Sequence, residues 1–246
     1  MTAFQKKLKG TANELLAKNL IYTIDDCPDI DSYHMMSLYN YAMQNKFKNY
    51  LIAVNLSADT TFNDQPLTYT EWNKQLNEIL LKDNVPFLEA FAKAKYCLEK
   101  VFLDVTKCGK LEYTYTKDAL LTPKELQKKL SISSSTVSRY VEHGLEIVHG
   151  YGHRTYPKHN VFYWSNGVWA SRVQSLYQTF RLRNRTKEDI IEEVKGEIAK
   201  FEEKYKGKFA LVFGHVVDPY TLGEPDDYYN WRDFLEELKE LQEQNA

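Results

Sequence analysis

The chain has 246 residues, 43% of them hydrophobic and 14% aromatic, and a formal net charge of −2 at pH 7. This composition excludes a disordered chain, and the length allows two or three small domains. No stretch approaches the roughly 20 apolar residues that span a bilayer, the polar N-terminus is unlike a signal peptide, and the cysteines lack CxxC spacing, so we expect a cytoplasmic protein with reduced thiols and no membrane contact.

The charge is distributed unevenly along the chain. Residues 1–120 carry 14 Lys and Arg and 15 Asp and Glu, residues 121–186 carry 10 and 3, and residues 187–246 carry 8 and 16. The net +7 of the middle block is the pattern expected of a surface that binds nucleic-acid phosphates. The net −8 of the last block predicts a solvated surface, or one that binds a basic partner or the protein's own basic block.

Residues 1–118 predict a mostly helical domain of unknown role. Apolar residues at helical spacing, together with runs of strand-forming residues, give the expected elements. These are helices over residues 1–20, over 32–49, from Thr70 and from Pro86, and extended segments over 50–56 and 107–116. The first helix would bury Phe4, Leu8, Leu15 and Leu16. Residues 21–31 would form a break whose carboxylates serve a solvated loop or a helix cap rather than a metal site.

The strongest local signals lie in the middle of the chain. Residues 122–125 form a capping box with proline at the first helical position, which predicts a helix up to about Leu130. A serine turn then leads to a second helix, capped by Ser133 or Ser134. Gly144 would end that helix, because glycine suits the left-handed position that follows a helix.

Helical spacing turns the apolar residues of the second helix inward and leaves a polar face outside. The inward residues are Val137, Tyr140 and Val141, and the outward residues are Ser134, Ser135, Ser138 and Arg139. Small hydroxyl side chains and an arginine can approach base edges and phosphates closely. This face is therefore a candidate nucleic-acid-binding surface.

The same region resembles a known family. Its core Thr136-Val137-Ser138-Arg139 looks like the recognition helix of helix-turn-helix repressors of the Lac type. More diagnostic residues follow in the order Gly144-Leu145, Gly150-Tyr151-Gly152-His153-Arg154-Thr155-Tyr156, Asn160-Val161 and Trp164. This order resembles the winged helix-turn-helix of MerR-type regulators, phage excisionases and some phage terminase small subunits, and it implies a glycine-tipped wing and a short closing helix. The motif departs from many relatives at Gln127 and Ser131, where alanine and glycine are common.

The residues and the resemblance together predict DNA contacts from both helices, the wing and the basic helix that follows. The second helix would enter the major groove, with Arg139 contacting guanine or the backbone, and the wing would lie along a neighbouring groove or phosphate strand. The candidate DNA-binding residues are Thr122, Lys124, Ser133, Ser134, Ser135, Thr136, Ser138, Arg139, His149, Tyr151, His153, Arg154, Lys158, Arg181, Arg183 and Arg185.

The remaining residues predict a basic helix followed by an acidic α+β segment. The expected elements are a helix over residues 168–183, a helix from Thr186 to Tyr205, a strand over 209–217, a loop over 219–227 and a closing helix that contains Trp231. Apolar residues from Ile191 to Tyr205 step by three and four, which fits a helix hairpin or a dimeric coiled coil. The predicted fold class is mainly α with small β elements: a central winged helix-turn-helix (119–165) between a helical N-terminal domain (1–118) and an α+β C-terminal segment (166–246).

The sequence carries no recognisable catalytic or metal-binding pattern. Its clustered histidines are His143, His149, His153 and His159. No cysteine lies among them and no carboxylate has a ligand-like spacing, so zinc is not expected. The glycines of residues 150–152 lack the Lys-Ser/Thr of a phosphate loop. We therefore expect no catalytic residues, no cofactor, no metal and no enzyme activity.

These observations predict a sequence-specific double-stranded DNA-binding protein, a transcriptional regulator of bacterial or mobile-element origin. One alternative is an architectural DNA-binding factor, either excisionase-like or a phage packaging-initiation subunit. Another is a protein-interaction or antitoxin-like inhibitor that acts through the acidic C-terminal segment. A homodimer is expected, because the recognition helix presents mostly serines and one copy would discriminate weakly between sequences. A protein partner for the N-terminal or the acidic region is a further expectation.

Overall fold

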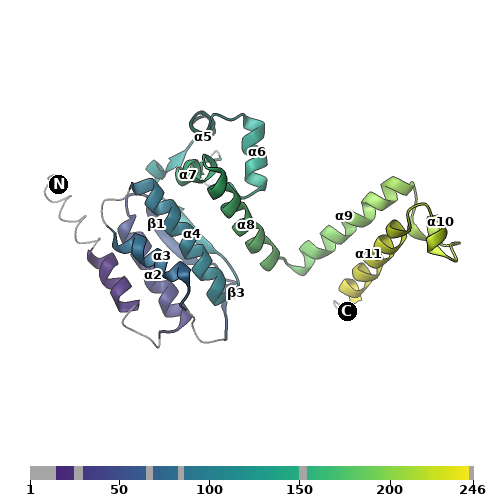
Figure 1. The fold of residues 1–246 in the computed structure, drawn as a ribbon, viewed down its shortest axis with the longest axis horizontal. Coiled ribbons are helices and arrows are strands. Elements are labelled where there is room, and N and C mark those ends of the chain that lie inside the picture. The colour runs from purple at the N-terminus through teal and green to yellow at the C-terminus, as the bar shows by residue number, and fades with distance from the viewer. Residues whose placement is uncertain (1–14, 25–29, 65–68, 83–85, 150–153, 244–246) are drawn as a thin grey trace. The chain divides into compact units, whose positions relative to one another are not determined.

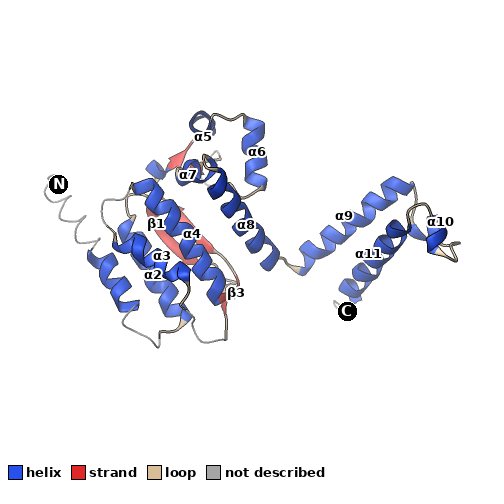
Figure 2. Cartoon of the chain, in the orientation of Figure 1, coloured by secondary structure: helices blue, strands red, loops and turns tan. Residues whose placement is uncertain are grey.

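The computed structural model describes residues 15–24, 30–64, 69–82, 86–149 and 154–243. Over these residues the chain is mainly helical, with small two-stranded antiparallel sheets (Figure 1, Figure 2). Its contacts divide it into two compact units, which we call the first or N-terminal unit (residues 1–184) and the C-terminal unit (residues 185–246). The predicted domain boundaries near residues 118 and 165 therefore both fall inside the first unit.

The first unit begins with an N-terminal layer, which we define as residues 15–118. Its elements are a helix over residues 15–24, α2 (Ser32–Lys46), β1 (Leu51–Leu56), β2 (Thr61–Phe62), α3 (Glu71–Leu81), α4 (Phe87–Val105), β3 (Thr106–Cys108) and β4 (Leu111–Tyr115). β1 pairs antiparallel with β4, and β2 pairs antiparallel with β3. α3 lies along α4, and α2 packs against β1 (Figure 1).

Local signals set the helix starts in this layer. Asp31 caps α2 by accepting the His34 N–H at 2.8 Å, one of the roles predicted for the carboxylates of the break. At the start of α3 the Thr70 N–H donates to the Asn73 side chain at 2.9 Å. α4 then supplies a large share of the core through buried residues that include Phe91, Leu98 and Phe102.

The first helix differs from its prediction. The chain is still helical at residues 21–24, where a break was expected. The exposed residues are Leu15 and Leu16, and the buried residues are Ala17, Ile21 and Ile24. The buried residues are spaced by four and three, so they form one helical face that continues past residue 20. Phe4 and Leu8 lie outside the described residues.

The basic segment, which we define as residues 119–184, follows the short helical turn η1 (Lys117–Ala119). Its elements are β5 (Leu120–Leu121), α5 (Pro123–Leu130), α6 (Ser134–Glu142), β6 (Tyr156–Pro157), α7 (His159–Trp164) and α8 (Gly167–Arg183). The predicted capping box is confirmed, because the Thr122 N–H donates to the Glu125 carboxylate at 2.8 Å and the Thr122 hydroxyl accepts the Glu125 N–H. Ser133 caps α6, and Gly144 follows it with φ of 101°, both as predicted.

The short helices of the basic segment share one core with their neighbours. Leu126 of α5, Val137 of α6 and Trp164 of α7 are buried together, and Ala92 of α4 belongs to the same cluster. Tyr140 stacks on Trp164 with 4.3 Å between ring centroids. α5 and α6 are therefore held by contacts with α7 and the N-terminal layer as well as by contact with each other.

The chain between α6 and α7 (residues 143–158, the α6–α7 connection) is described at residues 143–149 and 154–158. An isolated bridge joins Val148 to Thr155, and β6 pairs antiparallel with β5. The expected glycine tip of the wing falls within residues 150–153, which lie outside the described residues. The predicted closing helix is present as α7.

The C-terminal unit, residues 185–246, is a helix hairpin. Its elements are α9 (Lys187–Tyr205), α10 (Phe209–Phe213), the short turn η2 (Pro219–Thr221) and α11 (Pro225–Glu243). α9 packs along α11 of the same chain, which is the hairpin alternative left open by the sequence. Fully buried Trp231 forms the centre of the core, together with Val194, Ile198 and Phe213.

The strand predicted over residues 209–217 is wrong. α10 occupies its first half, and the described part of this unit contains no strand, so the unit is helical rather than α+β. Phe209 and Phe213 lie four residues apart on one helical face, with their ring centroids 5.4 and 5.9 Å from that of Trp231. The helix satisfies its own backbone hydrogen bonds, whereas a strand here has no described partner strand.

Within the described ranges, none of the helices combines the length and the apolar character needed to cross a lipid bilayer.

Candidate nucleic-acid interface

The outer face of α6 carries the polar residues that the sequence predicted. Its exposed residues are Ser134, Ser135, Ser138 and Arg139. Thr136 is half-buried, and its N–H donates to the capping oxygen of Ser133 at 3.2 Å. The Ser133 oxygen also lies 2.8 Å from that of Ser135. Ser133 therefore orients the first turn of α6, and the remaining exposed residues form the surface.

The turn between α5 and α6 depends on one residue in the left-handed region. Ser131 has φ of 55° and ψ of 43°, and its N–H donates to the Gln127 carbonyl. This conformation costs a non-glycine residue roughly 1–2 kcal/mol, whereas glycine adopts it without that cost. The departure at Ser131 thus changes the residue but keeps a left-handed turn.

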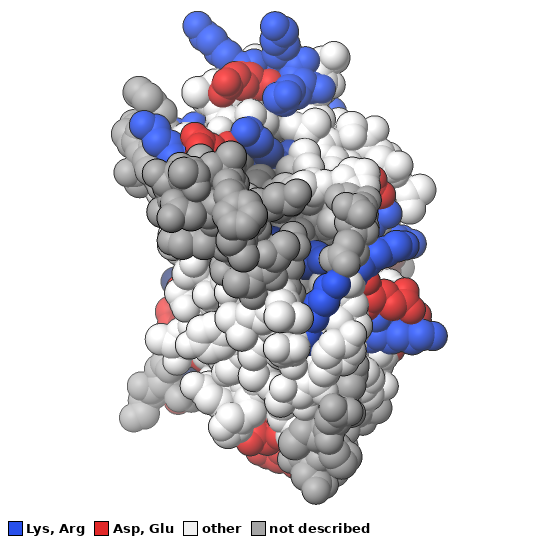
Figure 3. All heavy atoms as spheres, turned by 90° about the vertical axis from the view of Figure 1, so that its left-hand side faces the viewer, with Lys and Arg blue, Asp and Glu red and all other residues white. Residues whose placement is uncertain are grey.

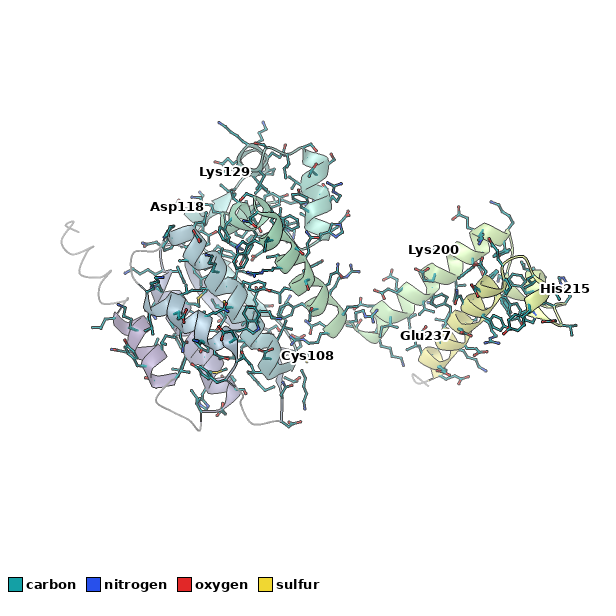
Figure 4. All side chains as sticks on the ribbon, viewed as in Figure 1. Cys108, Asp118, Lys129, Lys200, His215 and Glu237 are labelled. Carbon is teal, nitrogen blue, oxygen red and sulfur yellow. The ribbon has the colours of Figure 1, made fainter. Side chains whose placement is uncertain are left out.

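α5 adds a basic surface next to this turn. Lys124, Lys128 and Lys129 are all exposed, and Thr122 is exposed while it serves as the cap. Lys129 is labelled beside α5 in Figure 4. In Figure 3, Lys and Arg side chains project from the upper end of the molecule, where α5 lies in Figure 1.

The α6–α7 connection contributes further candidates. His149 and Arg154 are exposed, each next to one residue of the isolated Val148–Thr155 bridge. Lys158 is half-buried, and its N–H donates to the Ala119 carbonyl at 2.8 Å, which ties the start of α7 to the end of η1. The predicted contacts Tyr151 and His153 lie outside the described residues.

The end of α6 is fixed against α8. A Cβ placed on Gly144 would lie 2.7 Å from the Cβ of Tyr177, closer than real side chains approach. Glycine is therefore required at position 144 for two reasons: the backbone is left-handed, and Tyr177 of α8 leaves no room for a side chain. Gly144, which follows α6, thus packs directly against Tyr177 of α8.

The arginines that follow the motif have different roles. Arg181 is exposed, as a phosphate contact requires. Arg185 belongs to the C-terminal unit and pairs with Glu193 at 2.6 Å, so its charge is already partly neutralised. Arg172, near the start of α8, lies over the ring of Trp169 at 4.9 Å.

Arg183 faces inward rather than toward a ligand. Its guanidinium donates to the carbonyls of Thr106 at 3.2 Å and Gly109 at 2.8 Å. It also lies over the rings of Phe102 and Phe180, at 5.4 and 5.1 Å. Arg183 thus fastens the end of α8 to the turn between β3 and β4, and the sequence-based assignment to DNA does not match this placement.

A cluster of ionisable groups that the sequence did not predict lies between the N-terminal layer and the basic segment. Glu146 of the α6–α7 connection lies 3.0 Å from His159 Nε2 and 3.4 Å from Lys95 Nζ, and it accepts from the Tyr115 hydroxyl at 2.8 Å. Lys95 also pairs with Glu99 on α4. Lys95 and His159 are almost fully buried, while the Glu146 side chain keeps 25% of its surface exposed.

The ionisation of this cluster follows from its burial. Burial lowers the pKa of His159, although Glu146 beside it acts in the opposite direction. Burial also raises the pKa of Glu99. For Glu146 burial is outweighed, because attraction to Lys95 and the hydrogen bond with His159 lower its pKa to about 2. At neutral pH the cluster therefore combines an ionised Glu146 with a neutral His159.

The sequence held only a weak signal for this cluster. Glu146 is one of three carboxylates in residues 121–186, and Asn160 belongs to the motif that carries the resemblance. Of the neighbouring histidines, His143 and His149 are exposed, unlike His159, and His153 is outside the described residues. In the described part of the chain, no group of three or more His, Cys, Asp or Glu side chains is arranged to hold a metal ion.

Comparison with known proteins adds no identification, since no protein family model, curated protein or solved structure matches the chain.

Proposed function

We propose that this protein binds double-stranded DNA in a sequence-dependent manner through α5, α6 and the α6–α7 connection, as a winged helix-turn-helix regulator of transcription. The observation that carries the proposal is the exposed face of α6. α6 is the second of two short capped helices joined by a tight turn, and this face presents Ser134, Ser135, Ser138 and Arg139. Such a helix fits the major groove, where an arginine reads guanine and small hydroxyls permit close approach.

The surface charge supports the same proposal. Of the carboxylates in residues 121–186, Glu146 is turned toward Lys95 and His159 inside the fold, which leaves Glu125 and Glu142 exposed. Against these stand exposed cations that include Lys124, Lys128, Lys129, Arg139, Arg154 and Arg181. The surface is therefore clearly basic even though Arg183 is withdrawn from it. A basic surface of this kind is what contacts with DNA phosphates require.

Selection from a random duplex library followed by fluorescence anisotropy tests the proposal. We expect an enriched duplex that binds much more tightly than unrelated DNA at moderate salt, because base contacts add to the phosphate contacts. Equal binding of all duplexes would favour an architectural factor over a regulator. No binding to any duplex would reject the proposal.

A protein partner for the C-terminal unit is the second candidate function. Around α10 and η2, Leu211, Val217 and Tyr220 are 79, 98 and 78% exposed, which is unusual for large apolar side chains. His215 lies at this same end of the unit in Figure 4. Pull-down experiments with the full chain and with the triple variant Leu211→Ser, Val217→Ser, Tyr220→Ser test this candidate. A partner that binds both chains equally does not use this surface.

A further inference from the structure

Glu146 joins three elements on which the proposed DNA-binding surface depends. Its carboxylate contacts Lys95 of α4, Tyr115 of β4 and His159 of α7. Its backbone is held as well, because the side chain of Asn160 accepts the Glu146 N–H at 3.3 Å and donates to the Glu146 carbonyl at 2.9 Å. The first part of the α6–α7 connection is thus fixed by its side chain and its main chain together.

The partners of Glu146 are themselves held in place. The His159 N–H donates to the Tyr50 hydroxyl at 2.7 Å, and the same hydroxyl lies 3.3 Å from His159 Nδ1. A neutral His159 that carries its proton on Nε2 places that N–H 3.0 Å from a Glu146 carboxylate oxygen, while Nδ1 accepts from the Tyr50 hydroxyl. Tyr50 belongs to the core of the N-terminal layer, so the network passes from that core to the α6–α7 connection.

Among the described residues, Glu146 with Lys95 is the ion pair that links the connection to the N-terminal layer. An ion pair and hydrogen bonds fix relative orientation more closely than apolar contact alone, because their geometry is directional. Removing one member also leaves its partners in a protein interior without compensation. The network can therefore determine the orientation of α6 and of the α6–α7 connection relative to the N-terminal layer.

We infer that Glu146 is a positioning residue, which holds the α6–α7 connection on the N-terminal layer and so sets the geometry in which α6 meets DNA. This inference rests on the proposed function for its DNA part only. Glu146 itself does not belong to the exposed face of α6 and has no contact with DNA in this account. The N-terminal layer, whose role the sequence left open, is then the platform that orients the DNA-binding helices.

Two matched changes of charge test the inference in the full chain. Glu146→Gln and Glu142→Gln each remove one carboxylate from the basic segment, but Glu142 is exposed at the end of α6. Loss of a surface carboxylate alone favours binding to a polyanion, so Glu142→Gln is expected to bind the selected duplex at least as tightly as the wild type. Glu146→Gln is expected to bind about tenfold more weakly, and Glu146→Ala more weakly still.

Amide hydrogen exchange supplies a readout that needs no DNA. In Glu146→Ala the amides of Val148 and Lys158 are expected to exchange about tenfold faster, while those of Leu98 and Val101 on α4 keep wild-type rates. Faster exchange confined to the connection supports a positioning role. Equally faster exchange on α4 means general destabilisation and overturns it, as do wild-type rates throughout.

The two readouts separate the inference from the proposed function. If exchange changes as expected but Glu146→Gln binds DNA as tightly as Glu142→Gln does, then Glu146 does not set the geometry in which α6 meets DNA, and that part of the inference is overturned. If the wild type binds no duplex, the proposed function fails. Local exchange in Glu146→Ala then still supports the positioning of the connection on the N-terminal layer, and uniform or unchanged exchange overturns that too.

Discussion

Two helix pairs in this chain start with the same signal and end in different structures. α5 begins with the Thr122–Glu125 capping box and α9 with the equivalent Thr186–Asp189 box. α5 and α6 are 8 and 9 residues long and bury Leu126 and Val137 in a core completed by other elements. α9 and α11 are each 19 residues long and enclose a core of their own around Trp231.

The difference shows that one helix pair can leave a surface free for binding, whereas another can fold around a core of its own. A short pair whose core is completed by other elements leaves most of its own surface exposed. In α5 and α6 that surface is basic and carries small hydroxyl groups. A long pair with its own core depends little on the rest of the chain, and here it is acidic. The capping box sets where each helix starts. Which elements supply the core determines whether the pair exposes a binding surface or folds independently.

The largest effect is expected from Trp231→Ala in the C-terminal unit. Truncation of a fully buried tryptophan costs about 3–5 kcal/mol, and the surrounding rings of Phe201, Phe209 and Phe213 lose their central contact. Limited proteolysis read by mass spectrometry should then show new cleavage after residue 185, while the described residues of the N-terminal unit keep their wild-type protection. Tyr220→Ala, an exposed aromatic in the same unit, serves as the control. Loss of protection in both units at once would mean that they do not fold separately.

Lowering the pH should distinguish the two units next. The folded pKa of His159 is depressed, so its contribution to stability is complete above pH 6.5 and is lost as the pH falls below that value. The contribution of Glu146, whose pKa is about 2, is lost below pH 4.5, and the raised pKa of Glu99 opposes both. In the C-terminal unit, bonds from Lys204 depress the pKa of Asp227, so acid acts there only below about pH 4.

We therefore expect the urea midpoint of the N-terminal unit to fall between pH 7.5 and 5.5 while that of the C-terminal unit stays constant. His159→Gln should flatten this dependence, because it removes the group that takes up the proton. An N-terminal unit with equal midpoints at both pH values would show that His159 is not held neutral by burial.

Arg181 and Arg183 give a matched pair on one helix. Arg183→Ala should lower the stability of the N-terminal unit by about 1–3 kcal/mol, because it removes hydrogen bonds from a charged group to Thr106 and Gly109. Arg181→Ala should leave stability unchanged. If α8 follows the DNA backbone, Arg181→Ala should reduce the slope of log affinity against log salt by about 0.9, and Arg183→Ala should leave it alone. The reverse assignment would place Arg183 on the DNA.

The smallest effect is expected at Ser131. Ser131→Gly relieves the left-handed strain at φ of 55° but increases the freedom of the unfolded chain, so the net gain should stay below about 1 kcal/mol. Ser131→Val should instead destabilise the N-terminal unit, since a β-branched residue is poorly accommodated there. Chemical denaturation of both variants measures the difference. Equal stability of the two would contradict the left-handed turn.

The elements that the sequence predicted well are those whose signals are local. The start of α5 depends on residues three apart, and the ends of α6 on Ser133 and Gly144, so propensity and capping were sufficient. The basic character of residues 121–186 could also be predicted from the sequence, because it depends only on how many charged residues lie in one stretch of chain.

The elements that failed depend on contacts between distant residues. Phe209–Phe213 contains strand-forming residues, but the position of Trp231 decides that it is a helix. The Glu146 network joins residues as far apart as Tyr50 and His159, and no spacing in the sequence brings them together. Arg183 was assigned to DNA because it lies among arginines, although Gly109 and Thr106 bind it.

The most direct measurement is the preference of Arg139→Ala for the selected duplex over random DNA, compared with Arg232→Ala on α11. We expect that Arg139→Ala loses roughly 1–3 kcal/mol of binding to the selected duplex and most of its preference for that duplex, while retaining its salt dependence. Arg232→Ala should bind both DNAs as the wild type does. An Arg139→Ala protein with unchanged preference would contradict the role of α6 as the element that reads DNA.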